Sequence, residues 1–244
     1  MLSLCWETIN QHQHPRPAKL RGFLIIQNYS IISVMKQLPI QKEIEILTTT
    51  TFVAGIDEAG RGPWAGPVVA ACLVLDQTKI ELIKNNQEYS VADSKKMTEK
   101  AREKTFAWLT NNFTFGVGIV EAEIIDQINI LQATKLAMTQ AIKNSGVKIE
   151  HLLIDAVKLP INIKQENIIS GDAKVWCIAA ASVIAKVTRD KIMLELHKQF
   201  PQYGFDSHKG YGTAKHQEAL KNHGVSSTHR KSYQPIKELL NPQS

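Results

Sequence analysis

The sequence is poor in cysteine and contains no paired cysteine motif. Its three cysteines, Cys5, Cys72 and Cys177, are far apart, and none belongs to a CxxC pair. An odd and scattered set supports neither a disulfide framework nor a cysteine-based zinc site. Cys72 and Cys177 lie in apolar runs, so we expect both to be small core residues of a protein in a reducing, cytoplasmic compartment.

The sequence also lacks an apolar run long enough to cross a membrane. Such a run needs about 20 residues, whereas the stretch from Leu20 to Met35 is interrupted by polar and charged residues. The first 34 residues lack the order of a signal peptide, and their three basic residues against one acid weakly resemble an organelle-targeting presequence. Alternatively, Met35 is the true start and the upstream segment is disordered or misassigned. We expect a soluble monomer without membrane contact.

Basic residues outnumber acidic ones, and they gather toward the C-terminus. Lys and Arg number 29 against 23 Asp and Glu, which gives a net charge of +6 and a pI near 9.1. This balance indicates a polyanionic partner but does not separate nucleic acid from an anionic membrane. After Pro201 we expect a basic helical region that binds the polyanion, with Lys209, Lys215, Lys221, Arg230 and Lys231.

From Phe52 onward, apolar runs alternate with segments of helical period, which predicts an α/β fold with a mixed sheet flanked by helices. Strands are expected at 51–56, 67–75, 114–120 and 151–155, with a hairpin-like pairing of the first two. Helices are expected at 97–111, where Thr98 is the N-cap, at 131–144, and from about Ala173 to Phe200, ended by Pro201. We divide the chain into an N-terminal extension over 1–50, a domain over 51–240 and a tail over 241–244.

Two adjacent carboxylates, Asp57 and Glu58, end the first predicted strand and precede a Gly-Arg-Gly turn. Open α/β folds usually bind ligands at the ends of strands. Gly60 and Gly62 allow backbone N–H groups to approach a ligand closely, and Arg61 supplies a planar donor suited to phosphate. A single acid here would most simply be a solvated turn residue, but this combination indicates metal and phosphate chemistry.

Two further acids lie at element ends. Asp155 ends the strand that begins at His151, and Asp172 precedes the long helix, where an isolated Asp would most often be an N-cap. If the first and fourth strands are neighbours, Asp57, Glu58, Asp155 and Asp172 converge, and their repulsion requires divalent cations. Oxygen ligands favour Mg²⁺ or Mn²⁺, and two such ions suit the hydrolysis of a phosphodiester.

The chain resembles the ribonuclease HII family, the type 2 ribonucleases H of bacteria, over roughly Phe52 to Leu239. The resemblance rests on seven blocks in the family's order: Gly55-Ile-Asp-Glu-Ala-Gly-Arg-Gly-Pro, Asp93-Ser-Lys-Lys-Met-Thr, Asn129-Ile-Leu-Gln-Ala-Thr, Gly171-Asp-Ala-Lys, Ala179-Ala-Ala-Ser-Val-Ile-Ala-Lys-Val-Thr-Arg-Asp, His208-Lys-Gly-Tyr-Gly-Thr and His229-Arg-Lys-Ser-Tyr. It departs from the pattern at Ala156, where glycine is common, at Val225, where proline is usual, and at Tyr233, where phenylalanine is frequent.

The resemblance implies an RNase H-like fold and endonucleolytic cleavage of RNA paired with DNA, including a single ribonucleotide within duplex DNA. It implies cleavage on the 5′ side of the ribonucleotide, leaving a 3′-hydroxyl and a 5′-phosphate. The four catalytic and metal-binding acids correspond to Asp57, Glu58, Asp155 and Asp172. The ribose readers correspond to Gly60, Arg61, Gly62 and Tyr211.

Several other residues could contact the substrate or have a purely structural role. Ser94, Lys95, Lys174 and Lys209 are candidate substrate contacts, although lysines on turns and helix flanks are often simply solvated. Arg189 and Asp190 are expected to pair with each other. Arg230 is a candidate contact to the nucleic-acid backbone, as are His208 and His229, for which a structural role is favoured.

Two alternatives to a ribonuclease stay open at this point. One is a nucleic-acid-binding module that has lost catalysis. The other is a DNA-resolving nuclease or a transposase-like enzyme, which would share the carboxylates but not the ribose reader. Retention of all four acids argues against the first, and Gly60 to Gly62 with Tyr211 argues against the second.

Overall fold

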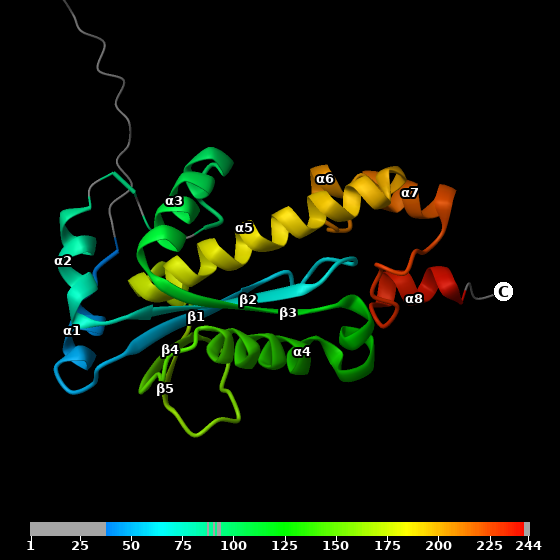
Figure 1. The fold of residues 1–244 in the computed structure, drawn as a ribbon. Coiled ribbons are helices and arrows are strands. Elements are labelled where there is room, and N and C mark those ends of the chain that lie inside the picture. Colours follow the sequence, from blue (N-terminus) through cyan, green and yellow to red (C-terminus); the bar gives the residue numbers. More distant parts are fainter. Residues whose placement is uncertain (1–37, 87, 90, 92–93, 242–244) are drawn as a thin grey trace, which may run out of the picture. The chain divides into compact units, whose positions relative to one another are not determined.

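The computed structural model describes residues 38–86, 88–89, 91 and 94–241. Five strands form one mixed sheet in the order β3-β2-β1-β4-β5 (Figure 1). The strands are β1 (Val53–Ala59), β2 (Val68–Leu75), β3 (Thr114–Val120), β4 (His151–Asp155) and β5 (Lys164–Ile168). The helices are α1 (Gln41–Leu47), α2 (Gln77–Asn85), α3 (Glu99–Asn112), α4 (Ala122–Asn144), η1 (Gly171–Ala173), α5 (Trp176–Gln199), η2 (Pro201–Tyr203), α6 (Phe205–His208), α7 (Ala214–His223) and α8 (Gln234–Leu240).

The pairing of the strands matches the sequence-based expectation. β1 and β2 form an antiparallel pair across the glycine-rich turn, with Ala59 opposite Val69. β1 and β4 are parallel neighbours, with Ile56 opposite Ile154. The carboxyl ends of β1 and β4 therefore lie at the same edge of the sheet.

Successive side chains of each strand point to opposite faces of the sheet, so the core has two layers. Val53, Leu73 and Leu153 pack on one face together with α5, whereas Ile56, Cys72 and Ile154 pack on the other. Figure 1 shows α5 along one face of the sheet and α4 along the opposite face. Residues separated by an even number of positions along a strand point to the same face of the sheet. Asp57 therefore points to the same face as Val53, and Asp155 to the same face as Leu153, which is the face covered by α5.

The central helix α5 lies directly on the sheet. A Cβ atom at Gly55 would be 2.2 Å from the Cys177 carbonyl carbon, so only glycine fits at this crossing. The alanine-rich start of α5 permits this close approach, as the sequence predicts. The helix begins at Trp176, later than expected, and it ends before Pro201 as expected.

The N-terminus of α5 is capped by a residue from α1. Its own N-cap, Val175, makes no side-chain capping bond. Instead, the fully buried Glu43 accepts a hydrogen bond from the Cys177 amide at 2.9 Å, and a carboxylate is favourable at this end of a helix. The compact fold therefore includes residues upstream of 51, which the sequence analysis assigns to an extension.

Some elements differ from the expectation. Thr98 caps α3 as predicted, but α4 begins at Ala122 and includes a break at Asn129, whose φ of 66° and side-chain bonds to following amides start the second half of the helix. α2 and β5 are not predicted by the sequence analysis. Within the described part of the chain, no helix is long and apolar enough to cross a membrane. The hypotheses about residues 1–34 and the tail from 242 concern positions outside the described residues.

Candidate active site

Three acids form one electrostatic cluster at the carboxyl ends of β1 and β4. Asp57 and Asp155 each lie one residue beyond the last paired residues of the two parallel strands, Ile56 and Ile154. Glu58 follows at the end of β1, and its amide donates to Asp57 Oδ1 at 2.8 Å. The predicted neighbourhood of the first and fourth strands, which brings Asp57 and Asp155 to one edge, is thus confirmed.

Burial makes the negative charges of this cluster unfavourable. Asp57 is 5% exposed, and its pKa lies well above the usual range because burial disfavours the charged form and because Glu58 and Asp155 are negative neighbours. Burial also raises the pKa of Glu58, while Arg61, with Nη1 3.4 Å from Glu58 Oε1, partly offsets the rise. A positive charge at this site would be stabilised.

Asp155 and Asp172 are fixed by separate contacts. Asp155 Oδ1 accepts a hydrogen bond from the Gly171 amide at 3.0 Å, which ties the end of β4 to η1. Asp172 is 5% exposed and pairs with Lys95 at 3.2 Å. Asp172 is therefore an ion-pair partner of Lys95 rather than the N-cap of α5, which is Val175. Among the described residues, the acids that interact electrostatically at this edge are Asp57, Glu58 and Asp155.

The backbone conformation at Ala156 explains why glycine is common at this position in the resembling family. Ala156 has a φ of 51°, in the left-handed region. An alanine there costs about 1–2 kcal/mol relative to the ordinary right-handed conformation, whereas glycine adopts it freely. The backbone must turn sharply here, directly after a predicted metal ligand.

The carboxylates suit a hard cation, although they do not form a ready-made cage. Among the described residues, no group of three His, Cys, Asp or Glu side chains is close enough together to hold a metal ion without rearrangement. Arg61 and Lys95 draw Glu58 and Asp172 into ion pairs instead. Glu58 Oε2, however, is buried and has no hydrogen-bond partner among the described residues. An orphaned carboxylate oxygen beside Asp57 and Asp155 fits the oxygen ligation of Mg²⁺ or Mn²⁺.

A pocket of about 220 Å³ opens beside the acids. It is lined by residues of the Gly-Arg-Gly turn, of α5 and of the C-terminal region: Glu58, Ala59, Gly60, Arg61, Gly62, Ser94, Lys95, Ser182, Lys186, Arg189 and Tyr211. Tyr211 is 45% exposed, and a Cβ on Gly62 would be 3.7 Å from its ring carbon Cε1. The structure thus brings together Glu58, the turn and Tyr211, although Tyr211 follows Glu58 by 153 residues in the sequence.

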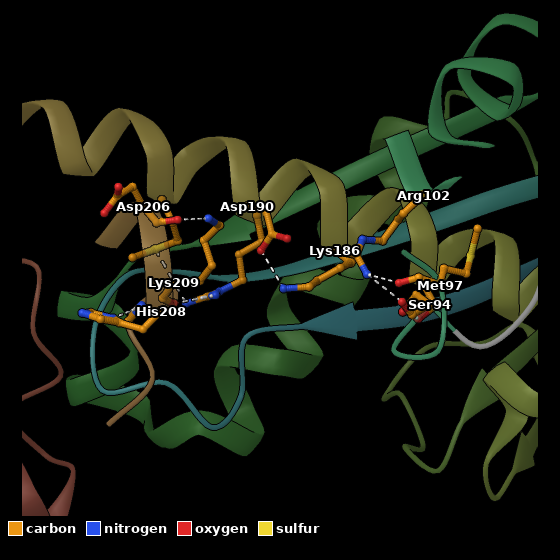
Figure 2. Close-up of polar contacts among 12 residues, drawn as sticks. Ser94, Met97, Arg102, Lys186, Asp190, Asp206, His208 and Lys209 are labelled. Carbon is orange, nitrogen blue, oxygen red and sulfur yellow. Dashed lines mark hydrogen bonds and ion pairs between the residues drawn. The ribbon is translucent and has the colours of Figure 1, made fainter. Parts of the chain in front are cut away.

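The other candidate substrate contacts divide into two groups. Ser94 and Lys95 line the pocket, with Ser94 Oγ buried 2.9 Å from Ser182 Oγ. Lys174 donates to the Ile169 carbonyl and lines a different depression beside α1. Lys209 donates to the Asp206 carbonyl (Figure 2). It does not line the pocket.

Four residues that line the pocket are not among the site residues predicted from the sequence: Ala59, Arg189, Ser182 and Lys186. Ser182 on α5 contacts Asp57 and lowers the pKa of that carboxyl, against the larger effect of burial. Lys186, one turn further along α5, pairs with Asp190 at 2.7 Å (Figure 2). Both lie in the block that starts at Ala179, so the helical period of that block could have placed them on the face of Asp57.

Two arginines have partners other than the predicted ones. Arg189 does not pair with Asp190; it donates to the carbonyls of Ala65, Pro67 and Lys209 at 2.9–3.1 Å. Arg230 is fully buried, so it cannot contact a nucleic-acid backbone as proposed from the sequence. These roles cannot be predicted from the sequence, because the acceptors are main-chain carbonyls, which every residue type has.

Buried histidines hold the backbone around Tyr211. The Ser226 amide donates to His229 Nδ1 at 3.0 Å, so His229 carries its hydrogen on Nε2, which lies 3.0 Å from His216 Nε2. His216 must then accept at Nε2 and donate from Nδ1 to the Tyr211 carbonyl at 3.0 Å. This chain of bonds requires both rings to be neutral, in agreement with the structural role favoured for His229.

The histidines predict a loss of stability in acid. Burial lowers the pKa of His216 and of His229 to about 4 from 6.5. Because the folded-state pKa lies below the unfolded one, the stabilisation is complete above pH 6.5 and is lost as the pH falls toward 4. We expect the free energy of unfolding to drop by about 2–4 kcal/mol across this window, as measured by urea denaturation.

The matched variant for this measurement is His216→Gln, whose side chain can still accept and donate. Buried Asp57 and Glu58 titrate in the opposite sense, so the difference between the two proteins isolates the histidines. A pH dependence that is identical in the variant and the parent would contradict the assignment.

Comparisons with known proteins agree with this geometry. The sequence model of the family described as Ribonuclease HII matches residues 54–236. A ribonuclease HII of Bacillus cereus (strain B4264) is 50% identical over 191 residues, which cover 78% of this chain and 72% of the relative.

Solved structures share the fold. The ribonuclease H2 from Pyrococcus horikoshii OT3 superposes with a TM-score of 0.62 at 28% identity, over 77% of this chain and 96% of that one. Bst-RNase HIII, solved in complex with Mn²⁺, superposes with a TM-score of 0.62 over 78% of this chain and 69% of that one. At 16% identity, this last likeness concerns the fold alone.

Proposed function

Because the chain belongs to the ribonuclease HII family and is therefore a metal-dependent ribonuclease H, we propose that it cleaves both RNA–DNA hybrids and duplex DNA that contains a single ribonucleotide. Cleavage falls on the 5′ side of the ribonucleotide and leaves a 3′-hydroxyl and a 5′-phosphate. The observation that carries this proposal is the pocket in which Glu58 of the acid cluster adjoins the Gly60–Gly62 turn and Tyr211.

In this proposal, Asp57, Glu58, Asp155 and Asp172 bind two divalent cations, Mg²⁺ or Mn²⁺. Such ions supply an activated water and stabilise the leaving oxygen. A cation would stabilise the charged form of the buried Asp57 carboxylate and would supply a partner for the unpartnered oxygen of Glu58. Arg61 and Lys95, which neutralise Glu58 and Asp172 in the structure, exchange these partners for substrate phosphates.

The turn and Tyr211 select the ribonucleotide. The amides of the Gly60–Gly62 turn approach the ribose closely, because Gly62 has no side chain on the open side beside Tyr211, and the ring of Tyr211 packs against the sugar. Only the 2′-hydroxyl at this position distinguishes RNA from DNA. Ser94 and Lys95 are proposed to bind a neighbouring phosphate, and Lys174 and Lys209 to contact the duplex outside the pocket.

The direct test is incubation of the purified protein with a labelled DNA duplex that carries one ribonucleotide, with Mg²⁺ or Mn²⁺. We expect a single cut 5′ to the ribonucleotide, with the stated end groups, and no cut in an all-DNA duplex of the same sequence. An intact ribonucleotide duplex with well-folded protein would reject the proposal. Cleavage of both duplexes would instead indicate a DNA nuclease of the same fold.

We further propose that the protein acts as a monomer in the cytoplasm. Cys72 and Cys177 are both free and buried, which suits a reducing compartment. Size-exclusion chromatography with light scattering checks the oligomeric state.

A further inference from the structure

Arg230 binds the backbone of the Gly-Arg-Gly turn from inside the protein. Its guanidinium is fully buried and donates to the carbonyls of Gly60 at 2.6 Å, Arg61 at 3.0 Å and Gly66 at 3.0 Å. Bonds from a charged donor are stronger than those between neutral groups. A planar guanidinium can hold several carbonyls in fixed directions, which a lysine ammonium cannot.

The main chain around Arg230 is itself fixed. The Arg230 amide donates to the Trp64 carbonyl at 2.8 Å. The next two amides, of Lys231 and Ser232, donate to the Asp126 carboxylate of α4 at 2.9 and 2.8 Å. Tyr233 adds a second donor to the turn, because its hydroxyl bonds to the Arg61 carbonyl at 2.5 Å.

Because each peptide unit is planar, the hydrogen bonds to the Gly60 and Arg61 carbonyls also fix the direction of the amides that follow them. In a trans peptide the C=O and the following N–H point in opposite directions, and the described backbone contains no cis bond. Fixing the Gly60 carbonyl inward therefore turns the Arg61 N–H outward, and fixing the Arg61 carbonyl does the same for the Gly62 N–H. Neither amide donates to another described residue, and both residues are exposed at the pocket.

We propose that Arg230 is a positioning residue that aims the Arg61 and Gly62 amides at the ribose and thereby sets the preference for a ribonucleotide over a deoxynucleotide. This inference rests on the proposed function. It assigns substrate selectivity to a residue that does not touch the substrate.

The test measures binding separately from cleavage. The Asp57→Asn protein, with and without Arg230→Lys, is titrated by fluorescence anisotropy against a duplex with one ribonucleotide and an all-DNA duplex of the same sequence. Loss of one or two hydrogen bonds to the ribose lowers the preference for the ribonucleotide duplex about tenfold. Affinity for the all-DNA duplex stays within about twofold, because the phosphate contacts do not depend on the turn amides.

Tyr203→Phe is the control. Tyr203 is buried in the same C-terminal region, but it does not line the pocket, and its hydroxyl donates to the Gly224 carbonyl at 3.0 Å, away from the turn. A general loosening of the C-terminal region would reduce the preference in both variants. We expect the preference to fall in Arg230→Lys and to persist in Tyr203→Phe, with thermal melts confirming that both are folded.

The outcomes separate the two proposals. An Asp57→Asn parent that binds both duplexes equally would overturn the ribose reader and this inference with it. A parent that discriminates, together with a folded Arg230→Lys variant that discriminates equally well, overturns the role of Arg230 alone. If Arg230→Lys does not fold, Asp126→Ala decides, because it releases the Lys231 and Ser232 amides that fix the segment carrying Arg230: about a threefold loss of preference supports the inference, and an unchanged preference overturns it.

Discussion

Replacement of Asp57 by Asn is expected to reduce cleavage of the ribonucleotide duplex by at least about a thousandfold. A bound divalent cation stabilises the transition state by several kcal/mol, and each 1.4 kcal/mol corresponds to about tenfold in rate. Asparagine retains the shape of Asp57 but removes the charge that holds the cation. Single-turnover cleavage at saturating Mg²⁺ or Mn²⁺ measures the loss.

The same substitution is not expected to lower stability. The pKa of Asp57 is raised by burial and by Glu58 and Asp155, so its charged form is unfavourable in the metal-free protein. A neutral amide removes that repulsion, and the melting temperature in EDTA should equal or exceed that of the parent. Binding of the duplex should persist, since the phosphate contacts use other residues.

Glu195→Gln is the control for the loss of an acid. Glu195 lies on α5 as an exposed partner of Lys198, away from the cluster. This variant should cleave at the parental rate. If Asp57→Asn retained activity within tenfold of the parent, the role of Asp57 as a metal ligand would be wrong.

Tyr211→Ala is expected to reduce cleavage at a single ribonucleotide by about tenfold to a hundredfold. An aromatic ring that packs against a nucleotide contributes on the order of 1–3 kcal/mol. The ring is half exposed at the pocket, so truncation removes little buried surface. The backbone stays held by bonds from Thr213 and His216 to the Tyr211 carbonyl, and the melting temperature should change by no more than a few degrees.

Tyr211→Phe separates the ring from its hydroxyl. If the ring alone positions the sugar, this variant should retain most of the activity. A Tyr211→Ala protein that is fully active on the single-ribonucleotide duplex would remove Tyr211 from the proposed reader.

The elements that carry the catalytic acids are those that sequence patterns describe best. β1 and β4 each contain an apolar run, Val53–Ile56 and Leu152–Ile154, and Asp57 and Asp155 directly follow these runs. The two acids could therefore be placed at one edge of the sheet from the sequence. β5 was missed because its sequence, Lys-Gln-Glu-Asn-Ile, is polar and lies at the edge of the sheet. The first half of α4 was missed because Asn129 interrupts its period.

The supporting contacts of the site were beyond sequence reasoning. Arg189 and Arg230 look like surface or ion-pair residues, because these are the usual environments of arginine. Their acceptors are main-chain carbonyls, most of them more than 120 residues away in the sequence. Since every residue type has a carbonyl, the sequence does not identify these acceptors. In the same way, the tautomers of His216 and His229 follow only from the bonds made by Ser226 and Tyr211.

The distance in sequence between Gly60 and Arg230 has a consequence for synthesis on the ribosome. The turn is translated early, but the side chain that fixes its carbonyls comes 170 residues later, and β4, which brings Asp155 beside Asp57, follows β1 by about a hundred residues. A nascent chain that has not yet reached residue 230 therefore lacks the hydrogen bonds from Arg230 to the turn, even after the sheet has formed. Prematurely terminated chains should accordingly lack the selectivity of the finished protein.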